Sequence, residues 1–447
     1  MLSLSIFLHR AARNRADTTA TICGDRRRSW GDVAHRVRKA ASLLQGIGLR
    51  EGQRVAILSP NSDSYLECLF SVNWAGGVIV PINTRLAPPE IQYWLEDSGS
   101  SLLLVADPFV ETVQALRANL PNIEKFVYLG EGETPEGFLN YEVMLEAARE
   151  TDDAGRSGAD LAALFYTGGT TGRSKGVMIT HEGMFINVLQ WITAVGVTEE
   201  DRFLVIPPMF HAAGGENAIA AAALGATACI MPAFDVETGL RLIEQEQLTK
   251  LPLVATMLDM MVNHPAVENY DVSSIRRITY GASPLHERIL RRALEVFPDA
   301  SFYQVFGQTE GGPTVSVLAP RYHATEGPFA GKMKSAGQVV LGSQLAILDE
   351  AGRELPVGEI GEIAVQGPGV SPGYWNLDEV TRASRSGPWL RTGDGGYLDE
   401  DGFLYISDRI KDMIISGGEN VYPAEVEAVL MRRKEIVECA VVGTVSY

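Results

Sequence analysis

The sequence predicts an α/β protein. It would have a large N-terminal domain of two mainly parallel αβ sheets, a small antiparallel β subdomain, and the start of a small α+β C-terminal domain. Over the first three hundred residues, short apolar runs alternate with helical patterns, which requires crossover connections and parallel pairing. After Gly331 the apolar runs become shorter and are separated by turn signals such as Asp-Glu-Asp-Gly. This second pattern is typical of antiparallel structure.

The expected strands of the first part are short apolar segments rich in β-branched residues, at 54–58, 78–82, 102–106, 126–129, 164–167, 203–206, 228–231, 253–255, 277–280 and 302–306. The expected helices are longer and have a helical apolar period, at 30–45, 64–74, 89–95, 109–120, 182–193 and 285–296. A short amphipathic helix is expected within the first fifteen residues. After Arg409 we expect a helix over 423–431 and a strand over 436–442.

These elements predict a large N-terminal domain over residues 1–410. Within it, αβ lobes are expected at roughly 1–160 and 161–330, and a β subdomain at 331–410. The Asp-, Gly- and Ser-rich stretch 150–159 is the expected linker. Residues 411–447 would begin a C-terminal domain that is cut short, because a lone strand, helix and strand bury little surface.

Composition and charge exclude several classes of protein. The chain has 447 residues and a formal charge of −18, which disfavours nucleic-acid binding because an acidic surface repels phosphate backbones. The longest apolar stretch, 218–231, is too short to span a bilayer, so no integral membrane part is expected. The four cysteines, which form no Cys-x-x-Cys pair, are Cys23, Cys68, Cys229 and Cys439. They predict a reducing, cytoplasmic location and no zinc cluster.

The strongest local signal is the segment YTGGTTGRSKG at 166–176. Its glycines let backbone N–H groups approach a phosphate, and its threonines and lysine add donors and charge. The candidate phosphate-binding residues are Thr167, Gly168, Gly169, Thr170, Thr171, Gly172 and Lys175. The Walker spacing is absent, which argues against a P-loop kinase or ATPase. The alternative is a flexible turn between sheet and helix.

Two further segments end strands with small or polar residues. FYQVFGQTE at 302–310 places Thr309 beside Glu310, a pair that can bind a phosphoryl oxygen and a hard cation together. A strand end with a capping threonine is the simpler alternative. The segment YGASPL at 280–285 places small residues where a flat ring could lie on the backbone, and it is also a Pro-initiated helix start.

Two more segments complete the candidate site. WLRTGDGGY at 389–397 holds Asp394 between glycines, where a carboxylate can accept from two ribose hydroxyls. It continues to Arg409, and a surface salt bridge is the alternative for this pair. PPMFHAAGG at 207–215 contains His211, and a lone histidine is more often structural than catalytic. Its glycines leave room for a bulky acyl or aryl group.

In identity, order and spacing, these segments resemble the adenylate-forming superfamily of acyl-CoA synthetases, aryl-CoA ligases, nonribosomal adenylation domains and luciferases. The run KDMIISGGENVYP at 411–423 is similar to acyl-CoA synthetases in particular. The resemblance implies ATP, Mg²⁺, CoA and a small carboxylic acid as ligands. It covers almost the whole chain.

The resemblance also implies residue roles. Thr309 would contact the α-phosphate, Glu310 would bind Mg²⁺, and both would act in catalysis with Lys175. Phe306, usually tyrosine in the family, would lie against adenine. The implied nucleotide site further includes Gly281, Ala282, Ser283, Gln304, Val305, Gly307, Asp394, Arg409 and Lys411. The implied acyl pocket comprises Phe210, His211, Gly214, Gly215, Ala282 and Gly307, with His211 as wall or gate. Gly417 and Gly418 would border the CoA tunnel.

The implied reaction is attack of a carboxylate on ATP to give an acyl-adenylate, followed by displacement of AMP by a thiol, with positioning and charge neutralisation as the protein's tasks. The family's catalytic C-terminal lysine lies in a Pro-x-x-x-x-Gly-Lys segment, and no such segment follows Lys411. We therefore expect a truncated, slowly adenylating form.

Three alternatives stay open at this stage. The thiol could belong to a carrier protein instead of CoA. The chain could be a non-catalytic nucleotide- or acid-binding protein. The acid could be fatty or aromatic. A homodimer is compatible with the sequence, which does not define the oligomeric state.

Overall fold

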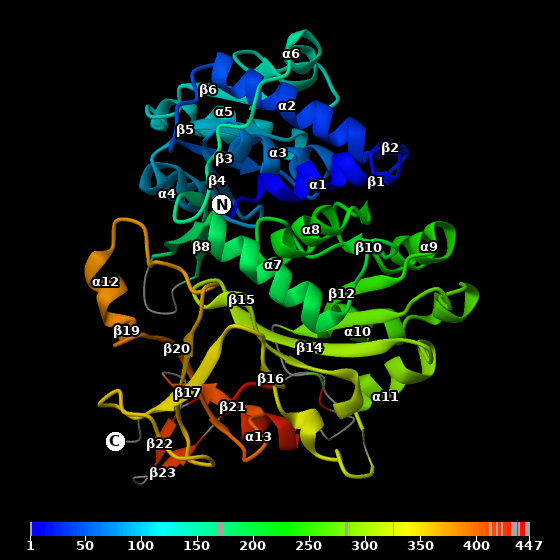
Figure 1. Cartoon of the computed structure of the whole chain (residues 1–447), viewed down its shortest axis with the longest axis vertical. Coiled ribbons are helices and arrows are strands. Elements are labelled where there is room, and N and C mark those ends of the chain that lie inside the picture. Colours follow the sequence, from blue (N-terminus) through cyan, green and yellow to red (C-terminus); the bar gives the residue numbers. More distant parts are fainter. Residues whose placement is uncertain are drawn as a thin grey trace.

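The computed structural model describes residues 2–168, 173–281, 285, 287–324, 326–410, 414–416, 419–421, 423–430, 436 and 439–442. It confirms the predicted α/β class. Figure 1 shows a blue and cyan sheet with its helices at the top, a green and yellow sheet below it, and a smaller yellow and orange sheet at the bottom.

The first sheet has seven strands in the order β7-β6-β5-β3-β4-β8-β9. All neighbours are parallel except β8 and β9. Its strands are β3 (Arg54–Leu58), β4 (Val78–Pro81), β5 (Ser100–Val105), β6 (Lys125–Tyr128), β7 (Leu139–Asn140), β8 (Leu161–Thr167) and β9 (Lys175–Thr180). The helices from this part of the chain are α2 (Trp30–Gly46), α3 (Asp63–Trp74), α4 (Pro88–Ser98), α5 (Val110–Leu116) and α6 (Tyr141–Ala147).

The second sheet has nine strands in the order β16-β15-β14-β13-β12-β10-β11-β1-β2. They are β1 (Thr19–Cys23), β2 (Arg26–Ser29), β10 (Arg202–Val205), β11 (Thr227–Ile230), β12 (Lys250–Val254), β13 (Arg277–Gly281), β14 (Ser301–Gln308), β15 (Gly312–Leu318) and β16 (Gln338–Val339). Its helices are α7 (His181–Val195), α8 (Ala212–Leu224), α9 (Val236–Glu246), α10 (Ala255–Val262) and α11 (Glu287–Val296).

The two sheets interleave along the sequence and do not divide at residue 160. β8 and β9 follow that point but join the first sheet, whereas β1 and β2 precede it and join the second. The amphipathic helix expected near the N-terminus is α1 (Ser5–Asn14). It packs on α8, and one apolar core runs from Leu8 of α1 through Val55 of β3 to Trp191 of α7.

The third sheet is antiparallel, as predicted. Its strands are β17 (Gln344–Leu348), β18 (Gly361–Gln366), β19 (Arg385–Ser386), β20 (Trp389–Leu398) and β21 (Leu404–Arg409). Helix α12 (Asp378–Ala383) follows β18. A hairpin of β22 (Ile414–Ser416) and β23 (Glu419–Val421) then precedes α13 (Pro423–Leu430).

The prediction of a strand over 436–442 is wrong at the residues that the structure describes in this range. Residues 436 and 439–442 belong to no strand. A strand needs a neighbour that satisfies its backbone N–H and C=O groups. Among the described residues, the nearby strands β22 and β23 pair with each other and with no third strand. Over the described ranges, no helix combines the length and apolar character needed to cross a membrane.

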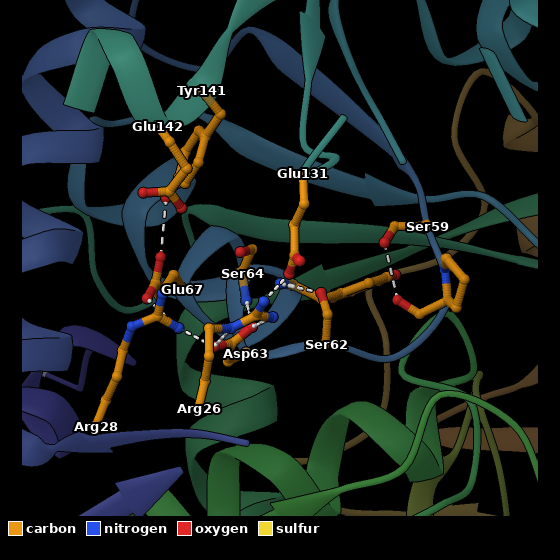
Figure 2. Close-up of polar contacts among 12 residues, drawn as sticks. Arg26, Arg28, Ser59, Ser62, Asp63, Ser64, Glu67, Glu131, Tyr141 and Glu142 are labelled. Atoms are coloured by element: carbon orange, nitrogen blue, oxygen red, sulfur yellow. Dashed lines mark hydrogen bonds and ion pairs between the residues drawn. The ribbon is translucent and has the colours of Figure 1, made fainter. Parts of the chain in front are cut away.

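A buried charge cluster fixes the β1–β2 hairpin to α3 (Figure 2). Arg26 donates to the Asp63 carboxylate at 3.0 and 2.8 Å, and Arg28 donates to it as well. Burial opposes ionisation of Asp63, but the hydrogen bonds from Arg26 and the charge of Arg28 outweigh it and lower the pKa of Asp63. Since the hairpin lies in the nine-stranded sheet and α3 follows β3, this cluster connects the two sheets.

A second buried polar group lies inside the helical layer. Glu216 of α8 is 1% exposed and accepts from Thr314 Oγ1 of β15 at 2.9 Å. Lys250 of β12 is fully buried, donates to Asn217, and lies 4.5 Å from the centroid of the Trp191 ring. Burial raises the pKa of Glu216 to about 8 and lowers the pKa of Lys250. The Glu216 carboxyl is therefore mostly protonated at pH 7.

This environment predicts a pH dependence of stability. The unfolded Glu216 carboxyl ionises near pH 4.3, so between that pH and about 8 this group holds one more proton in the folded state than in the unfolded state. Raising the pH through this window should lower the contribution of Glu216 to the free energy of unfolding by about 3–5 kcal/mol. We expect Glu216→Gln to remove this component when urea unfolding is followed from pH 5 to pH 9. The exposed Glu237→Gln should keep the wild-type profile, and identical profiles for all three proteins would contradict the assignment.

Candidate active site

The candidate phosphate loop connects β8 to β9. These strands are antiparallel, and their register places Thr167 opposite Lys175. The loop therefore begins and ends at neighbouring positions, and Lys175 lies beside Thr167. Gly168, the first loop residue after β8, is exposed.

The Thr-Glu pair lies in the turn between β14 and β15. Thr309 is buried. The Glu310 carboxylate reaches across to the first sheet, where its Oε1 accepts from Thr167 Oγ1 at 3.0 Å. Residues 143 positions apart thus meet at the ends of strands from two different sheets.

A third part of the chain joins this contact. The segment between β18 and α12, residues 367–377, is called the strap here. Tyr374 of the strap donates its hydroxyl to the same Glu310 oxygen at 3.1 Å. The Lys175 Nζ lies 4.5 Å from the centroid of the Tyr374 ring. The structure therefore brings Thr167, Lys175 and Glu310 together.

The strand-end segments predicted for adenine are neighbours in the second sheet. Gly281 lies opposite Val305, and Tyr280 lies opposite Gln304. A Cβ at Gly281 would overlap the Val305 carbonyl oxygen, so this close approach requires glycine. One residue further along β14, the half-buried Phe306 packs against two small apolar clusters, to which Ile363 and Val365 of the small sheet belong.

Gly307 also needs its missing side chain, because a Cβ there would overlap the carbonyl oxygen of Pro313 on β15. The register between β14 and β15 shifts at this point. The backbone irregularity ends regular pairing just before Thr309 and Glu310.

Asp394 and Arg409 face each other across β20 and β21. The Arg409 Nε is 3.6 Å from Asp394 Oδ1, and the aspartate side chain is mostly buried whereas the arginine is exposed. The strap continues directly from β18 of the small sheet that carries them. Because Ser371 N of the strap donates to the Glu310 carbonyl at 2.8 Å, the strap joins this sheet to the turn that holds Glu310.

Four of the six predicted acyl-pocket residues, Phe210, His211, Gly214 and Gly215, lie at the start of α8, whereas Gly307 lies in β14. Phe210 is half-buried, and the exposed His211 immediately precedes the helix. Gly214 approaches the backbone of Pro208 so closely that a Cβ would overlap it. A Cβ at Gly215 would lie 3.5 Å from the Phe165 ring, which is two residues before Thr167. This helix start therefore lies beside the phosphate-loop strand.

Some predicted site residues lie outside the described residues: Gly169, Thr170, Thr171, Gly172, Ala282, Ser283, Lys411, Gly417 and Gly418.

Comparison with known proteins decides the family. The AMP-binding enzyme family matches residues 8–375. The chain belongs to this family. A feruloyl-CoA synthase of Amycolatopsis is 37% identical over 97% of this AMP-binding enzyme and 84% of its own length. A fatty acid–[acyl-carrier-protein] ligase of Streptomyces coeruleorubidus is 36% identical over 97% and 82%.

Solved structures agree with this assignment. The o-succinylbenzoate CoA synthetase of Bacillus subtilis, in complex with its acyl-adenylate intermediate, has a TM-score of 0.86 and 30% identity, covering 99% of this AMP-binding enzyme and 85% of that chain. The protein is an enzyme of the adenylate-forming acid–CoA ligase type, with ATP and CoA as co-substrates.

The described residues fit a magnesium ion that arrives with ATP. Mg²⁺ is usually held by one or two carboxylates together with substrate phosphates and water. Glu310 supplies one carboxylate at a strand end, and one of its oxygens is oriented by two hydroxyl donors.

Sequence reasoning missed Tyr374. The tyrosine lies in a GYWN segment without charged neighbours, so no local pattern indicates a site. An isolated antiparallel β-bridge with Val177 of β9 places Tyr374 at the site. This bridge is a tertiary contact between residues that are distant in the sequence.

Proposed function

We propose that this AMP-binding enzyme joins a fatty or aromatic carboxylic acid to CoA through an acyl-adenylate. The contact between Thr167 and Glu310, with Lys175 beside it, is the observation that carries the proposal. It joins the glycine- and threonine-rich loop to the Thr-Glu pair at one point. A polyphosphate with a bound cation is the ligand that such a combination of donors, amine and carboxylate would suit.

Each group then has a role. Lys175 and the loop that begins at Thr167 hold the ATP phosphates, and Glu310 binds the Mg²⁺ of Mg·ATP. Thr309 contacts the α-phosphate, where the acid attacks. These groups position the reactants and neutralise charge as it develops.

The nucleoside lies between the second and third sheets in this proposal. Asp394 accepts from the ribose hydroxyls, and Arg409 also reaches the nucleotide. The adenine-side residues are Gly281, Ala282, Ser283, Gln304, Val305, Phe306 and Gly307. Lys411 is the pivot of the C-terminal domain, and Gly417 with Gly418 borders the CoA tunnel.

In this proposal the acid lies near the start of α8. Gly214 and Gly215 do not themselves leave the room expected from the sequence, because a Cβ at Gly214 would overlap the Pro208 carbonyl and one at Gly215 would contact the Phe165 ring. Phe210 and His211 form the adjoining wall. The named activities of the relatives support both acid classes, because feruloyl-CoA carries an aromatic acid and the Streptomyces ligase uses a fatty acid.

A carrier-protein thiol is the second candidate acceptor. The fatty acid–[acyl-carrier-protein] ligase, at 36% identity, favours it. The SGGENVYP run at 416–423 favours CoA through its similarity to acyl-CoA synthetases. A cytoplasmic location and a homodimer stay predictions from the sequence.

A panel of acids tests the proposal. The 447-residue chain should be incubated with ATP, Mg²⁺ and ferulate, benzoate, indoleacetate, octanoate or palmitate, and acyl-AMP measured by mass spectrometry over hours. We expect one class of acid to give acyl-AMP. Added CoA should then give a thioester. Nucleotide binding without acyl-AMP from any acid would instead favour the non-catalytic binding protein.

A further inference from the structure

The strap is attached to both large sheets. Met178 N of β9 donates to the Gly373 carbonyl at 2.9 Å, and Trp375 N donates to the Gly176 carbonyl at 2.7 Å. These bonds add one short strand-like segment to the edge of the seven-stranded sheet. At its other end, Ser371 N donates to the carbonyl of Glu310, which follows β14 of the nine-stranded sheet.

The strap conformation is specific to its sequence. Gly373 has a φ of +143°, and a Cβ there would overlap Thr381 of α12. The Thr381 Oγ1 accepts from Tyr374 N at 2.9 Å. Trp375 donates its Nε1 to the Asp97 carbonyl at 3.2 Å. Backbone contacts on both sides therefore fix where the Tyr374 side chain lies.

Tyr374 contacts two site groups with two different parts of its side chain. Its hydroxyl donates to Glu310 Oε1, and its ring face lies 4.5 Å from the Lys175 amine. The hydroxyl and the ring face of one side chain therefore act on two different groups of the site.

The alternative arrangement without this ring is a direct ion pair. A lysine and a glutamate at one site attract each other, and a paired carboxylate has less capacity for a cation. In the described contacts, Lys175 meets the Tyr374 ring and Glu310 meets two hydroxyls, and the two charges are not ion-paired with each other. A cation over a ring face is attracted to it, so the amine has a resting position away from the carboxylate.

We propose that Tyr374 is a positioning residue that keeps Lys175 and Glu310 apart and oriented, so that the amine meets phosphate oxygens and the carboxylate meets the magnesium ion of Mg·ATP. This inference rests on the proposed function. It adds a residue outside the glycine-rich loop and the Thr-Glu pair, and it assigns separate tasks to the hydroxyl and the ring.

Two substitutions separate those tasks. Tyr374→Phe keeps the ring and removes the hydroxyl, whereas Tyr374→Leu removes both. Binding of a non-hydrolysable ATP analogue should be measured by calorimetry with and without Mg²⁺. Trp375→Phe is the matched control, because it removes the hydrogen bond to Asp97 from the same strap without touching Lys175 or Glu310.

We expect Tyr374→Phe to reduce the gain in affinity that Mg²⁺ provides by about 10- to 100-fold, with little change in affinity without the metal, as for loss of one hydrogen bond to a charged group. Tyr374→Leu should additionally weaken binding without Mg²⁺ by about fivefold, as for loss of a cation–ring contact. Trp375→Phe should change neither the gain in affinity that Mg²⁺ provides nor the affinity measured without Mg²⁺. Combined with Lys175→Ala, Tyr374→Leu should lose its effect on metal-free binding, because the two act as one unit.

The proposal is overturned if both Tyr374 variants match Trp375→Phe in the affinity gain from Mg²⁺ and in the affinity without Mg²⁺, while their thermal melts show folded protein. It is also overturned if Tyr374→Leu and Lys175→Ala weaken metal-free binding additively. Failure of the proposed function is distinguishable, because that requires the wild-type chain to give no acyl-AMP from any acid, whereas this test measures nucleotide binding alone.

Discussion

Replacing Glu310 with glutamine is expected to slow acyl-adenylate formation by about 10²–10³-fold, the usual effect of removing one electrostatic group from a reacting centre. Glutamine keeps the size of the side chain and an oxygen that accepts from Thr167 and Tyr374. It removes the negative charge that the proposed magnesium contact requires. The rate of acyl-AMP formation should be measured under single-turnover conditions over a range of Mg²⁺ concentrations.

Folding is not expected to change in this variant. Glu359→Gln, in an exposed turn of the small sheet, is a control of equal charge change and should keep the wild-type rate. An adenylation rate within twofold of wild type for Glu310→Gln would show that the carboxylate has no part in the reaction.

Replacing Asp63 with alanine should lower the free energy of unfolding by about 3–5 kcal/mol, as for removal of one partner from a buried ion pair. Asp63 is 1% exposed and accepts from both Arg26 and Arg28. Without it, two guanidinium groups lose their shared partner beside α3. Urea unfolding should show a lower midpoint with an unchanged slope.

The same cluster provides a matched control. Glu131 also forms an ion pair with Arg26, but its side chain is 76% exposed. Glu131→Ala should therefore change stability by less than about 1 kcal/mol. Equal losses for the two variants would contradict the importance of burial in this cluster.

Elements with a regular apolar pattern could be predicted closely from the sequence. β3 begins and ends where the apolar run does, at Arg54 and Leu58. The hairpin of β20 and β21 follows from its Asp-Glu-Asp-Gly turn. In these segments, local propensity and burial favour the same structure.

Helix α8 was not predicted because it lacks an amphipathic period. It is buried on nearly every side and consists largely of alanine and glycine, so its pattern shows no polar face. The placement of β1 beside β11, the Glu310–Thr167 contact and the approach of Tyr374 depend on tertiary pairing between distant residues. Periodicity carries no information about such contacts.

The position of β1 has a consequence for synthesis. Thr21 pairs with Ala228 of β11, so one of the first strands to leave the ribosome pairs at once with β2 on one edge but finds its neighbour on the other edge only after some two hundred more residues have been made. At roughly 5–20 residues per second, that delay is roughly 10–40 s. During this time the nascent chain carries an unpaired, apolar strand edge, the kind of surface that chaperones bind. The speed of translation through the first half of the gene should therefore affect the yield of native enzyme more than the speed through the second half.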